Sequence, residues 1–313
     1  MPATPLPGSA PRRVMLMSKV PYLKPSLSVE QQLEFLKKRH LIIEDPAQAA
    51  QCLQFVTYHR LSNYFSPFEE APHHSESPFK AGSRFEDIWR LYLFDRQLRL
   101  LISDPIERIE VAFRTLLVNE LGDLYGSHWH MNADLFKDPQ EHDKWIKALK
   151  KSLHEYHHDP VIRRYYQQYE SPELPPIWQL MEVIPLGACS KLFSNLKKLK
   201  DKKQVCVAIK LHPTVIDSWL RAITYTRNLC AHHARVWNRW FVIAPKGFIR
   251  NFTRNTQPFL QQAYVLAQLS KQIDQQVPWK KALFQLLQAH ETFISIEEMG
   301  FDKNWQSDPF WSE

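Results

Sequence analysis

The sequence predicts an all-α protein, and three observations lead to that prediction. The 313 residues include only 7 Gly, which disfavours tightly turned all-β folds and glycine-lined phosphate loops. Apolar residues recur at three- and four-residue steps through most of the chain, the spacing of amphipathic helices. No stretch has the alternation and turn residues of a β-hairpin. An apolar content of 44% supplies a core for one large or two modest domains.

The N-terminal part of the chain divides into a tail and a small helical unit. Residues 1–17 are rich in proline and small residues and lack the apolar run of a signal peptide, so we expect a disordered tail. Residues 18–80 are expected to form a helical unit with its linker. One helix starts at Ser28, where a glutamine downstream resembles a capping box. A second covers about 46–57, and a loop broken by proline and serine follows over 58–83.

Residues 81–256 are expected to form the main domain, which opens with a long amphipathic helix over 85–121. Asp104, Pro105 and Glu107 stand in the order of a helix start, so we expect a kink or a restart there. Acid and base residues four apart suggest a solvated face of this helix. These pairs are Glu86 with Arg90, Asp95 with Arg99, and Glu110 with Arg114.

Further helices are expected along the rest of the chain. They cover about 141–157, 178–199 and 213–232. Residues 257–313 are expected to form a C-terminal extension with two more helices and an aromatic closing segment, whose tryptophans pack back on the body. No repeat of fixed period is visible, which makes a solenoid a poor fit.

The charge pattern indicates an anionic partner. The net charge is +7, and residues 218–273 contain no Asp or Glu although they carry eight Arg and Lys residues. The four cysteines lack the C-x-x-C spacing of a zinc ribbon, so we expect a reducing, cytoplasmic setting. No apolar run approaches the roughly 20 residues of a membrane span. The sequence calls for no cofactor.

Two histidines flanking a glutamate raise the alternative of a zinc hydrolase. His154, Glu155 and His158 match H-E-x-x-H, which on a helix provides two ligands and a general base. The match sits at the end of a lysine-rich helix before Asp159-Pro160, where a metalloprotease would have a buried apolar helix. A solvated helix end is the better interpretation, and no metal is expected.

A metal-free set of residues lies in the segment TRNLCAHHARVWNR. Arg227 can hold charge on a phosphate and His232 can move a proton, which suits attack by an RNA 2′-hydroxyl on its own phosphate. Asn228 and His232 share a helix face, whereas Arg227 lies about 140° away from His232. The arginine could reach round, the helix could break near Ala231, or two copies could meet in a dimer. A purely structural Arg–Asn pair with exposed histidines is the alternative.

This segment resembles the signature of the Abi-like bacterial proteins, phage abortive-infection factors of the AbiD and AbiF type within the HEPN superfamily. That superfamily is marked by an arginine, a polar residue, and a histidine four to six residues after the arginine. Further similar segments occur in the family's order: LSVEQQLEFLKKRHLII, YHRLSNYFSPF, FEDIWRLYLFDRQLRLLISDPIERIEVAFR, PPIWQLMEVIPLGACSKLFSNLK and MGFDKNW. The chain departs from the family at Pro105, where an uninterrupted helix is expected.

The resemblance implies an all-α HEPN-type bundle, commonly dimeric, with metal-independent endoribonuclease activity. It assigns Arg227, Asn228 and His232 to the motif, and His233 also falls within the permitted spacing. The resemblance also implies a toxin-like effector of phage defence that acts on RNA. An antitoxin, either a protein or an RNA, would be a further partner. A non-catalytic HEPN module that binds RNA or a partner is the alternative. The basic residues expected to contact the RNA backbone are Arg235, Arg239, Lys246, Arg250 and Arg254.

Overall fold

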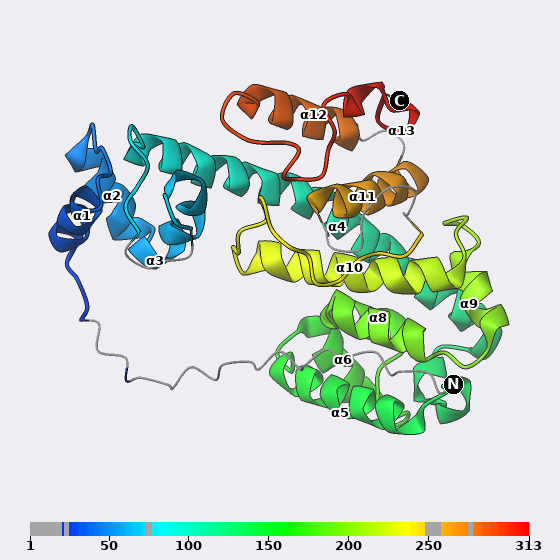
Figure 1. Cartoon of the computed structure of the whole chain (residues 1–313). Coiled ribbons are helices and arrows are strands. Elements are labelled where there is room, and N and C mark those ends of the chain that lie inside the picture. Colours follow the sequence, from blue (N-terminus) through cyan, green and yellow to red (C-terminus); the bar gives the residue numbers. More distant parts are fainter. Residues whose placement is uncertain (1–20, 22–24, 73–76, 248–257, 275–277, 313) are drawn as a thin grey trace, which may run out of the picture.

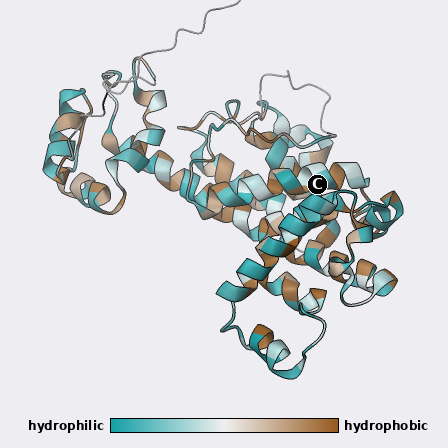
Figure 2. Ribbon diagram, turned by 90° about the horizontal axis from the view of Figure 1, so that it is seen from below, coloured by the Kyte–Doolittle hydropathy of each residue, from teal (hydrophilic) through white to brown (hydrophobic). Residues whose placement is uncertain are grey.

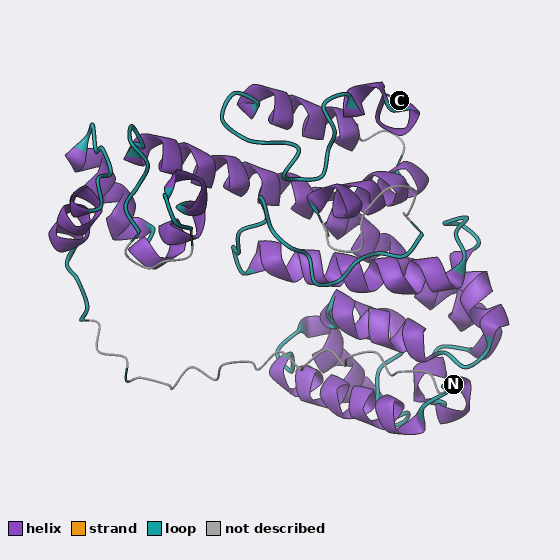
Figure 3. Ribbon diagram, viewed as in Figure 1, coloured by secondary structure: helices purple, strands orange, loops and turns teal. Residues whose placement is uncertain are grey.

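The computed structural model describes residue 21 and residues 25–72, 77–247, 258–274 and 278–312. Within these ranges the chain is helical and has no β-strand (Figure 3). Three isolated bridges pair extended residues. The all-α prediction is confirmed, while the expected tail over residues 1–17 lies outside the described residues.

The N-terminal helices begin where the sequence indicates. Helix α1 (Val29–Lys38) is closed by a capping box between Ser28 and Gln31, and α2 (Pro46–Phe55) is capped by Asp45. The segment expected as a loop instead holds α3 (Tyr58–Leu61) and two short 3-10 turns, η1 (Ser62–Tyr64) and η2 (Ser66–Phe68). Its aromatic side chains explain the difference, because Tyr64 and Phe65 are almost fully buried in the core.

Helix α4 (Phe85–Tyr125) runs for 41 residues, about 60 Å at the usual rise per residue. The restart expected at Pro105 was wrong, because the helix continues through this proline. Proline lacks an amide hydrogen and leaves the carbonyl four residues earlier without its helical donor. The indole Nε1 of Trp279 donates to that carbonyl, on Leu101, at 2.8 Å. A side chain from another helix thus supplies the missing bond.

The acid–base pairs on α4 do not form one solvated face. The Asp95 and Arg99 side chains are 0% and 7% exposed, and those of Glu110 and Arg114 are 13% and 19% exposed. Asp95 falls in step with buried Ile88, Leu91 and Leu98 on the inner side of the helix. The expectation of a solvated face was therefore wrong for these two pairs, since their positions on the helix, not their spacing, decide burial.

The middle of the chain forms five helices. They are α5 (Pro139–Glu155), α6 (Pro160–Gln168), α7 (Ile177–Val183), α8 (Leu186–Asn195) and α9 (Leu199–Cys206). The single helix expected over 178–199 is split, because Ile184 and Pro185 are extended between α7 and α8. A residue before proline avoids the helical region, which accounts for the break.

The remaining helices are α10 (Pro213–Ala231), α11 (Phe259–Ile273), α12 (Trp279–His290), the 3-10 turn η5 (Trp305–Ser307) and α13 (Pro309–Ser312). The closing tryptophan Trp305 is buried against Phe284 and Phe301, which both belong to the C-terminal extension. Hydrophilic and hydrophobic residues alternate around each helix (Figure 2), as in an amphipathic bundle.

Helix α4 organises the bundle. It packs against α7, α9, α10, α11 and α12, and Figure 1 shows α11 and α12 on one side of it and α10, α8 and α5 successively on the other. Helix α10 is held between α4 and α8. Gly187 of α8 permits a close approach there, because a Cβ at this position would lie 3.3 Å from the Thr224 methyl group. The fold thereby places α10 between two helix layers.

Candidate functional site at the end of helix α10

The motif lies at the C-terminal end of α10. Arg227 and Asn228 belong to its last turns, and the helix ends at Ala231 with His232 as its cap residue. The helix ends at Ala231, but the His232 amide still donates to the Asn228 carbonyl at 3.0 Å. The offset of about 140° from Arg227 therefore still applies to His232, and the chain leaves the helical path only at His233.

His233 turns the chain away from the helix axis. Its backbone is left-handed, with φ of 55°. The His233 amide donates to the Cys230 carbonyl at 3.0 Å, and the Ala234 amide donates to the Leu229 carbonyl at 2.9 Å. These two bonds form a Schellman motif, in which glycine is the usual residue at the left-handed position. A histidine here is held in a conformation that costs non-glycine residues about 1–2 kcal/mol.

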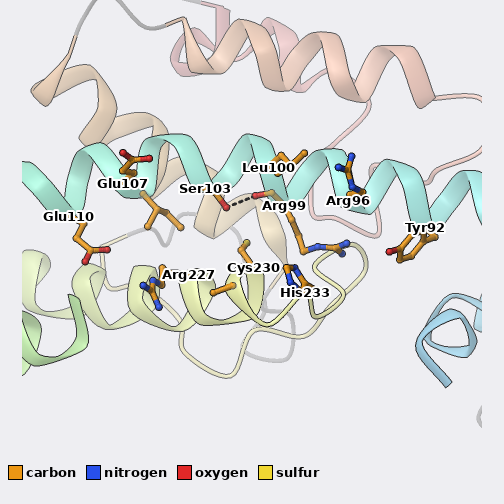
Figure 4. A pocket seen from close by; sticks show the side chains of 12 residues that line it. Tyr92, Arg96, Arg99, Leu100, Ser103, Glu107, Glu110, Arg227, Cys230 and His233 are labelled. Atoms are coloured by element: carbon orange, nitrogen blue, oxygen red, sulfur yellow. Dashed lines mark hydrogen bonds between the residues drawn. The ribbon is translucent and has the colours of Figure 1, made fainter. Parts of the chain in front are cut away.

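An open cavity of about 680 Å³, here named the α4 cavity, lies between α4 and the end of α10 (Figure 4). Arg227 and His233 both line it, whereas Asn228 and His232 do not. Helix α4 adds further charged side chains to the wall, namely Arg96, Arg99, Glu107 and Glu110. The cavity thus joins one motif arginine and one motif histidine.

The acidic residues on this wall come from another part of the sequence. The segment 218–273 has no acid, but Glu107 and Glu110 face the same cavity from α4. Glu110 is already paired with Arg114. Arg96 and Arg227 have no ion pair among the described residues, so they are the cations available to an anionic ligand.

Asp95 anchors the chain that follows His233. Its Oδ1 accepts the amide of Val236 at 3.0 Å and that of Trp237 at 2.6 Å. Its Oδ2 accepts the Tyr64 hydroxyl at 2.6 Å and is paired with the Arg99 guanidinium. Burial raises the pKa of this carboxyl, while Arg99 and the three hydrogen bonds favour its ionised form. The Asp95 carboxylate therefore joins α4 and Tyr64 of η1 to the loop that follows His233, through charge-assisted hydrogen bonds.

The N-terminal unit also holds this loop. Arg60 Nη1 donates to the His233 carbonyl at 2.7 Å. In the reverse direction, Arg235 Nη1 donates to the Asn63 carbonyl at 2.6 Å. The segment around α3 and η1, expected as a linker, is therefore part of the support of the motif.

Sequence reasoning missed Arg60, Asp95 and Arg99. A signal for the last two was present, because Asp95 and Arg99 fall on the apolar side of a strongly periodic helix between Leu91 and Ile102. Charged residues at such positions are almost never buried without a partner. No comparable signal marked Arg60, whose contact spans 173 residues of sequence.

The residues expected to bind RNA lie in different environments. Arg235 is partly buried, and burial lowers the pKa of its guanidinium. Arg239 Nη1 donates to the Arg235 carbonyl at 3.2 Å. Lys246 is exposed, and its carbonyl accepts the Trp219 indole at 2.8 Å. The other two, Arg250 and Arg254, lie outside the described residues.

The zinc alternative finds no geometry to support it. Helix α5 ends at Glu155, so His158 lies beyond it and does not share its face with His154. At this end the His157 ring contacts both the His158 ring, at 3.7 Å between centroids, and the His154 ring, at 5.8 Å. In the part of the chain that the structure describes, no three His, Cys, Asp or Glu residues are arranged to hold a metal ion.

Cys230 also lines the α4 cavity, but it is poorly suited to nucleophilic chemistry. It is 7% exposed. Burial raises the pKa of its thiol to about 12, and the thiolate is the reactive form. Like Cys52, Cys189 and Cys206, Cys230 is a buried free cysteine.

The chain matches the family of Abi-like proteins over residues 51–238. It therefore belongs to this family, a membership that suggests a role in phage abortive infection and is compatible with a nuclease effector. The match spans α4 and α10, which line the α4 cavity, and α3, whose Arg60 holds the loop at His233. No curated protein and no solved structure matches the chain. Among the described residues no helix is both long and apolar enough to cross a membrane.

Proposed function

We propose that this protein is a metal-independent endoribonuclease effector of phage defence, of the HEPN superfamily and of the AbiD and AbiF type. The observation that carries the proposal is the shared cavity, which Arg227 and His233 line together. Membership of the Abi-like family supports the defence role. RNA as substrate makes the cytoplasm the proposed site of action.

In the proposed reaction, the 2′-hydroxyl attacks the adjacent phosphorus. The new bond joins O2′ to phosphorus, and the bond from phosphorus to O5′ breaks. An imidazole takes the proton from the 2′-hydroxyl, and an imidazolium returns a proton to the leaving O5′. Arg227 holds the charge that builds on the non-bridging oxygens. The products are a 2′,3′-cyclic phosphate and a free 5′-hydroxyl, and no step requires a metal.

His233 is the proposed acid–base residue, because it lines the α4 cavity with Arg227. His232 is the alternative, and Asn228 is assigned to orient the arginine, whose Nη1 lies 3.4 Å from its Oδ1. A His233→Asn variant separates the two histidines cleanly. Asparagine tolerates the left-handed conformation at this position better than alanine does, and it cannot move a proton. His232→Asn is the matched control.

The test is incubation of the purified protein with total cellular RNA, with and without EDTA. Cleavage should persist in EDTA and yield cyclic-phosphate ends detected by mass spectrometry. His233→Asn should lower the rate by about 100-fold or more, the usual worth of general acid–base catalysis, and Arg227→Gln should lower it similarly. His232→Asn should retain activity.

Three outcomes would overturn parts of this proposal. Loss of activity only in His232→Asn would move the acid–base role to His232. RNA binding without any cleavage by the wild type would identify a non-catalytic module instead. Cleavage that stops in EDTA and returns with zinc would restore the reading built on His154, Glu155 and His158.

A homodimer is part of the proposal, supported by an exposed apolar stripe on α4. Leu93, Leu100 and Val111 are 38%, 57% and 56% exposed, and their separations of seven and eleven residues place them on one side of the helix. A two-fold contact between two such stripes would bring both motifs to one seam. Sedimentation should give a dimer, and Leu100→Glu should give a monomer. A wild-type monomer that cuts RNA would exclude the dimer.

A further inference from the structure

Asn228 opens onto a second cavity on the opposite side of α10 from α4. This cavity, here named the α8 cavity, has a volume of about 790 Å³ and lies between α5, α8 and Asn228. Its floor is well fixed, because the Lys137 amide donates to the Asn195 carbonyl at 2.9 Å. The Asn195 side chain in turn accepts the Asp138 amide at 3.0 Å. Arg227 lines the α4 cavity and Asn228 lines the α8 cavity, so these two adjacent motif residues face different cavities.

The α8 cavity carries uncompensated positive charge. Lys137, Lys144 and Lys191 line it with two acids, Asp138 and Glu141. The Asp138 carboxylate caps α5 by accepting two backbone amides, and Glu141 pairs with Lys144 at 2.6 Å. Lys137 and Lys191 have no ion pair among the described residues. These five side chains sum to a charge of +1, and the two lysines without an ion pair suit an anion.

A neighbouring lysine strengthens this charge. Lys202 is held by the Ser194 carbonyl at 2.7 Å. Burial, and then the Lys137 ammonium, lowers the pKa of Lys202, which indicates that two like charges stand near each other. Like charges held close are destabilising unless an anion lies between them. Lys202 thus adds positive potential beside Lys137, and Asp217 offsets part of it.

The last turn of α10 forms a ridge between the two cavities. Asn228 and Ala231 are exposed on it, and Arg227 is partly exposed. Ala231 also lines the α4 cavity, so a small side chain stands where the chain could be crossed. A strand that passes from one cavity to the other crosses the width of α10, about 10–12 Å with its side chains. A flexible polyanion can pass from one cavity to the other over this turn.

We propose that one single-stranded RNA crosses the last turn of α10, with one flank in the α4 cavity and the other in the α8 cavity. This proposal deepens the proposed function and rests on it for the position of the cut. Lys137 and Lys191 then contact phosphates on one side, and Arg96 contacts a phosphate on the other. A duplex presents a broad minor groove to a protein surface, which two hollows separated by a ridge do not match.

The first test measures binding without cleavage. A fluorescent RNA in which every 2′-hydroxyl is methylated cannot undergo attack by that oxygen, so anisotropy reports binding alone. Lys137→Glu with Lys191→Glu should weaken binding about tenfold or more and shallow the salt dependence, since each lost phosphate contact lowers the slope by about 0.7. Lys38→Glu with Lys303→Glu makes the same charge change at exposed sites elsewhere, and it should change affinity less than about twofold.

The second test blocks the α8 cavity without changing charge. Ala148 lines this cavity and is exposed, so Ala148→Trp fills it with little threat to the fold. Wild-type affinity should rise through a length series up to about a dozen nucleotides, within the range of known single-strand sites. In Ala148→Trp the gain from the longer oligonucleotides should be lost. Ala133→Trp, at another exposed alanine, is the control and should behave as wild type.

The outcomes separate this inference from the proposed function. If methylated RNA binds through both cavities but unmodified RNA is never cut, the strand path stands and the nuclease proposal fails. If RNA is cut normally by the Lys137, Lys191 and Ala148 variants while His233→Asn is inactive, the nuclease proposal stands and the strand path is overturned. An equal loss of RNA affinity in the Lys137, Lys191 variant and in the Lys38, Lys303 control would also overturn the strand path, because the loss would then reflect net charge alone.

Discussion

Helix α4 carries two ion pairs that look alike in the sequence and differ entirely in the fold. Asp95 with Arg99 and Asp104 with Arg108 are both aspartate–arginine pairs four residues apart. The first pair is 0% and 7% exposed, and the second is 48% and 42% exposed. Only Asp95 also bonds a hydroxyl and two backbone amides. Equal spacing predicts contact between the partners, but their position around the helix decides whether the contact organises anything else.

The largest effect is expected from breaking the buried pair. Asp95→Ala leaves Arg99 buried without its partner and frees the amides of Val236 and Trp237. Removal of one member of such a pair costs about 3–5 kcal/mol of the free energy of unfolding, measured by urea denaturation. Asp95→Asn, which keeps the shape and one acceptor, should cost less. A loss below about 1 kcal/mol in Asp95→Ala would show that the pair does not support the fold.

Among the described residues, His130 is a buried titratable residue without a hydrogen-bond partner, in contrast to Asp95. His130 is 0% exposed, and neither ring nitrogen has a hydrogen-bond partner in the structure. Burial, followed by His128 and His142, lowers its pKa from 6.5 to about 3. Between these values the unfolded chain takes up a proton that the folded chain does not, so stability falls as the pH falls.

The pH test compares two proteins. From pH 6.5 downward, His130 should lower the free energy of unfolding by up to about 1.4 kcal/mol per pH unit. Carboxylates titrate in the same range, so the measured quantity is the difference in slope between wild type and His130→Leu. The variant should have the shallower dependence. Identical slopes would mean that His130 is protonated in the fold.

Breaking the half-buried pair of Glu110 and Arg114 should change the free energy of unfolding by an amount between those of the buried and exposed pairs. Arg114 pairs with Glu110, and its Nη2 donates to the Ile184 carbonyl at 2.8 Å, just before the break between α7 and α8. Arg114→Met keeps the apolar stem and removes both bonds. We expect a loss of about 1–3 kcal/mol, the range for hydrogen bonds to charged groups. A neutral result in chemical denaturation would place this pair with the exposed ones.

The smallest effect is expected at the exposed pair. Arg108 contacts Asp104 at 3.1 Å and Asp274 at 2.9 Å, with much of its side chain in water. Solvent and salt screen such contacts. Arg108→Ala should leave the midpoint of thermal unfolding unchanged within error at physiological salt. A clear decrease would mean that the link from α4 to the end of α11 stabilises the fold.

The sequence predicted the helices better than their boundaries and contacts. Local signals placed α1, α2, α5 and α10 within a few residues, because caps and apolar spacing act over one or two turns. They failed at Pro105, where Trp279 replaces the lost donor from a distant helix. The division of the chain at residues 80 and 256 stays a prediction.

The site was predictable only in part. Arg227 and the adjacent histidines stand close in sequence, so a motif could mark them. Their surroundings depend on contacts such as that of Arg60 with His233, which no local pattern encodes. The choice between His232 and His233 likewise depends on how the chain leaves α10, and helix ends are the least certain feature of any sequence pattern.

The left-handed backbone at His233 favours glycine for stability, whereas the proposed reaction needs the imidazole of histidine at the same position. Glycine adopts φ near 55° without steric cost, so His233→Gly should make the chain more stable while it removes the imidazole. Under the proposed mechanism, random substitution that is screened for stability alone would therefore lose activity at this position. Under that mechanism, the histidine holds a less favourable backbone conformation in exchange for an imidazole in the α4 cavity.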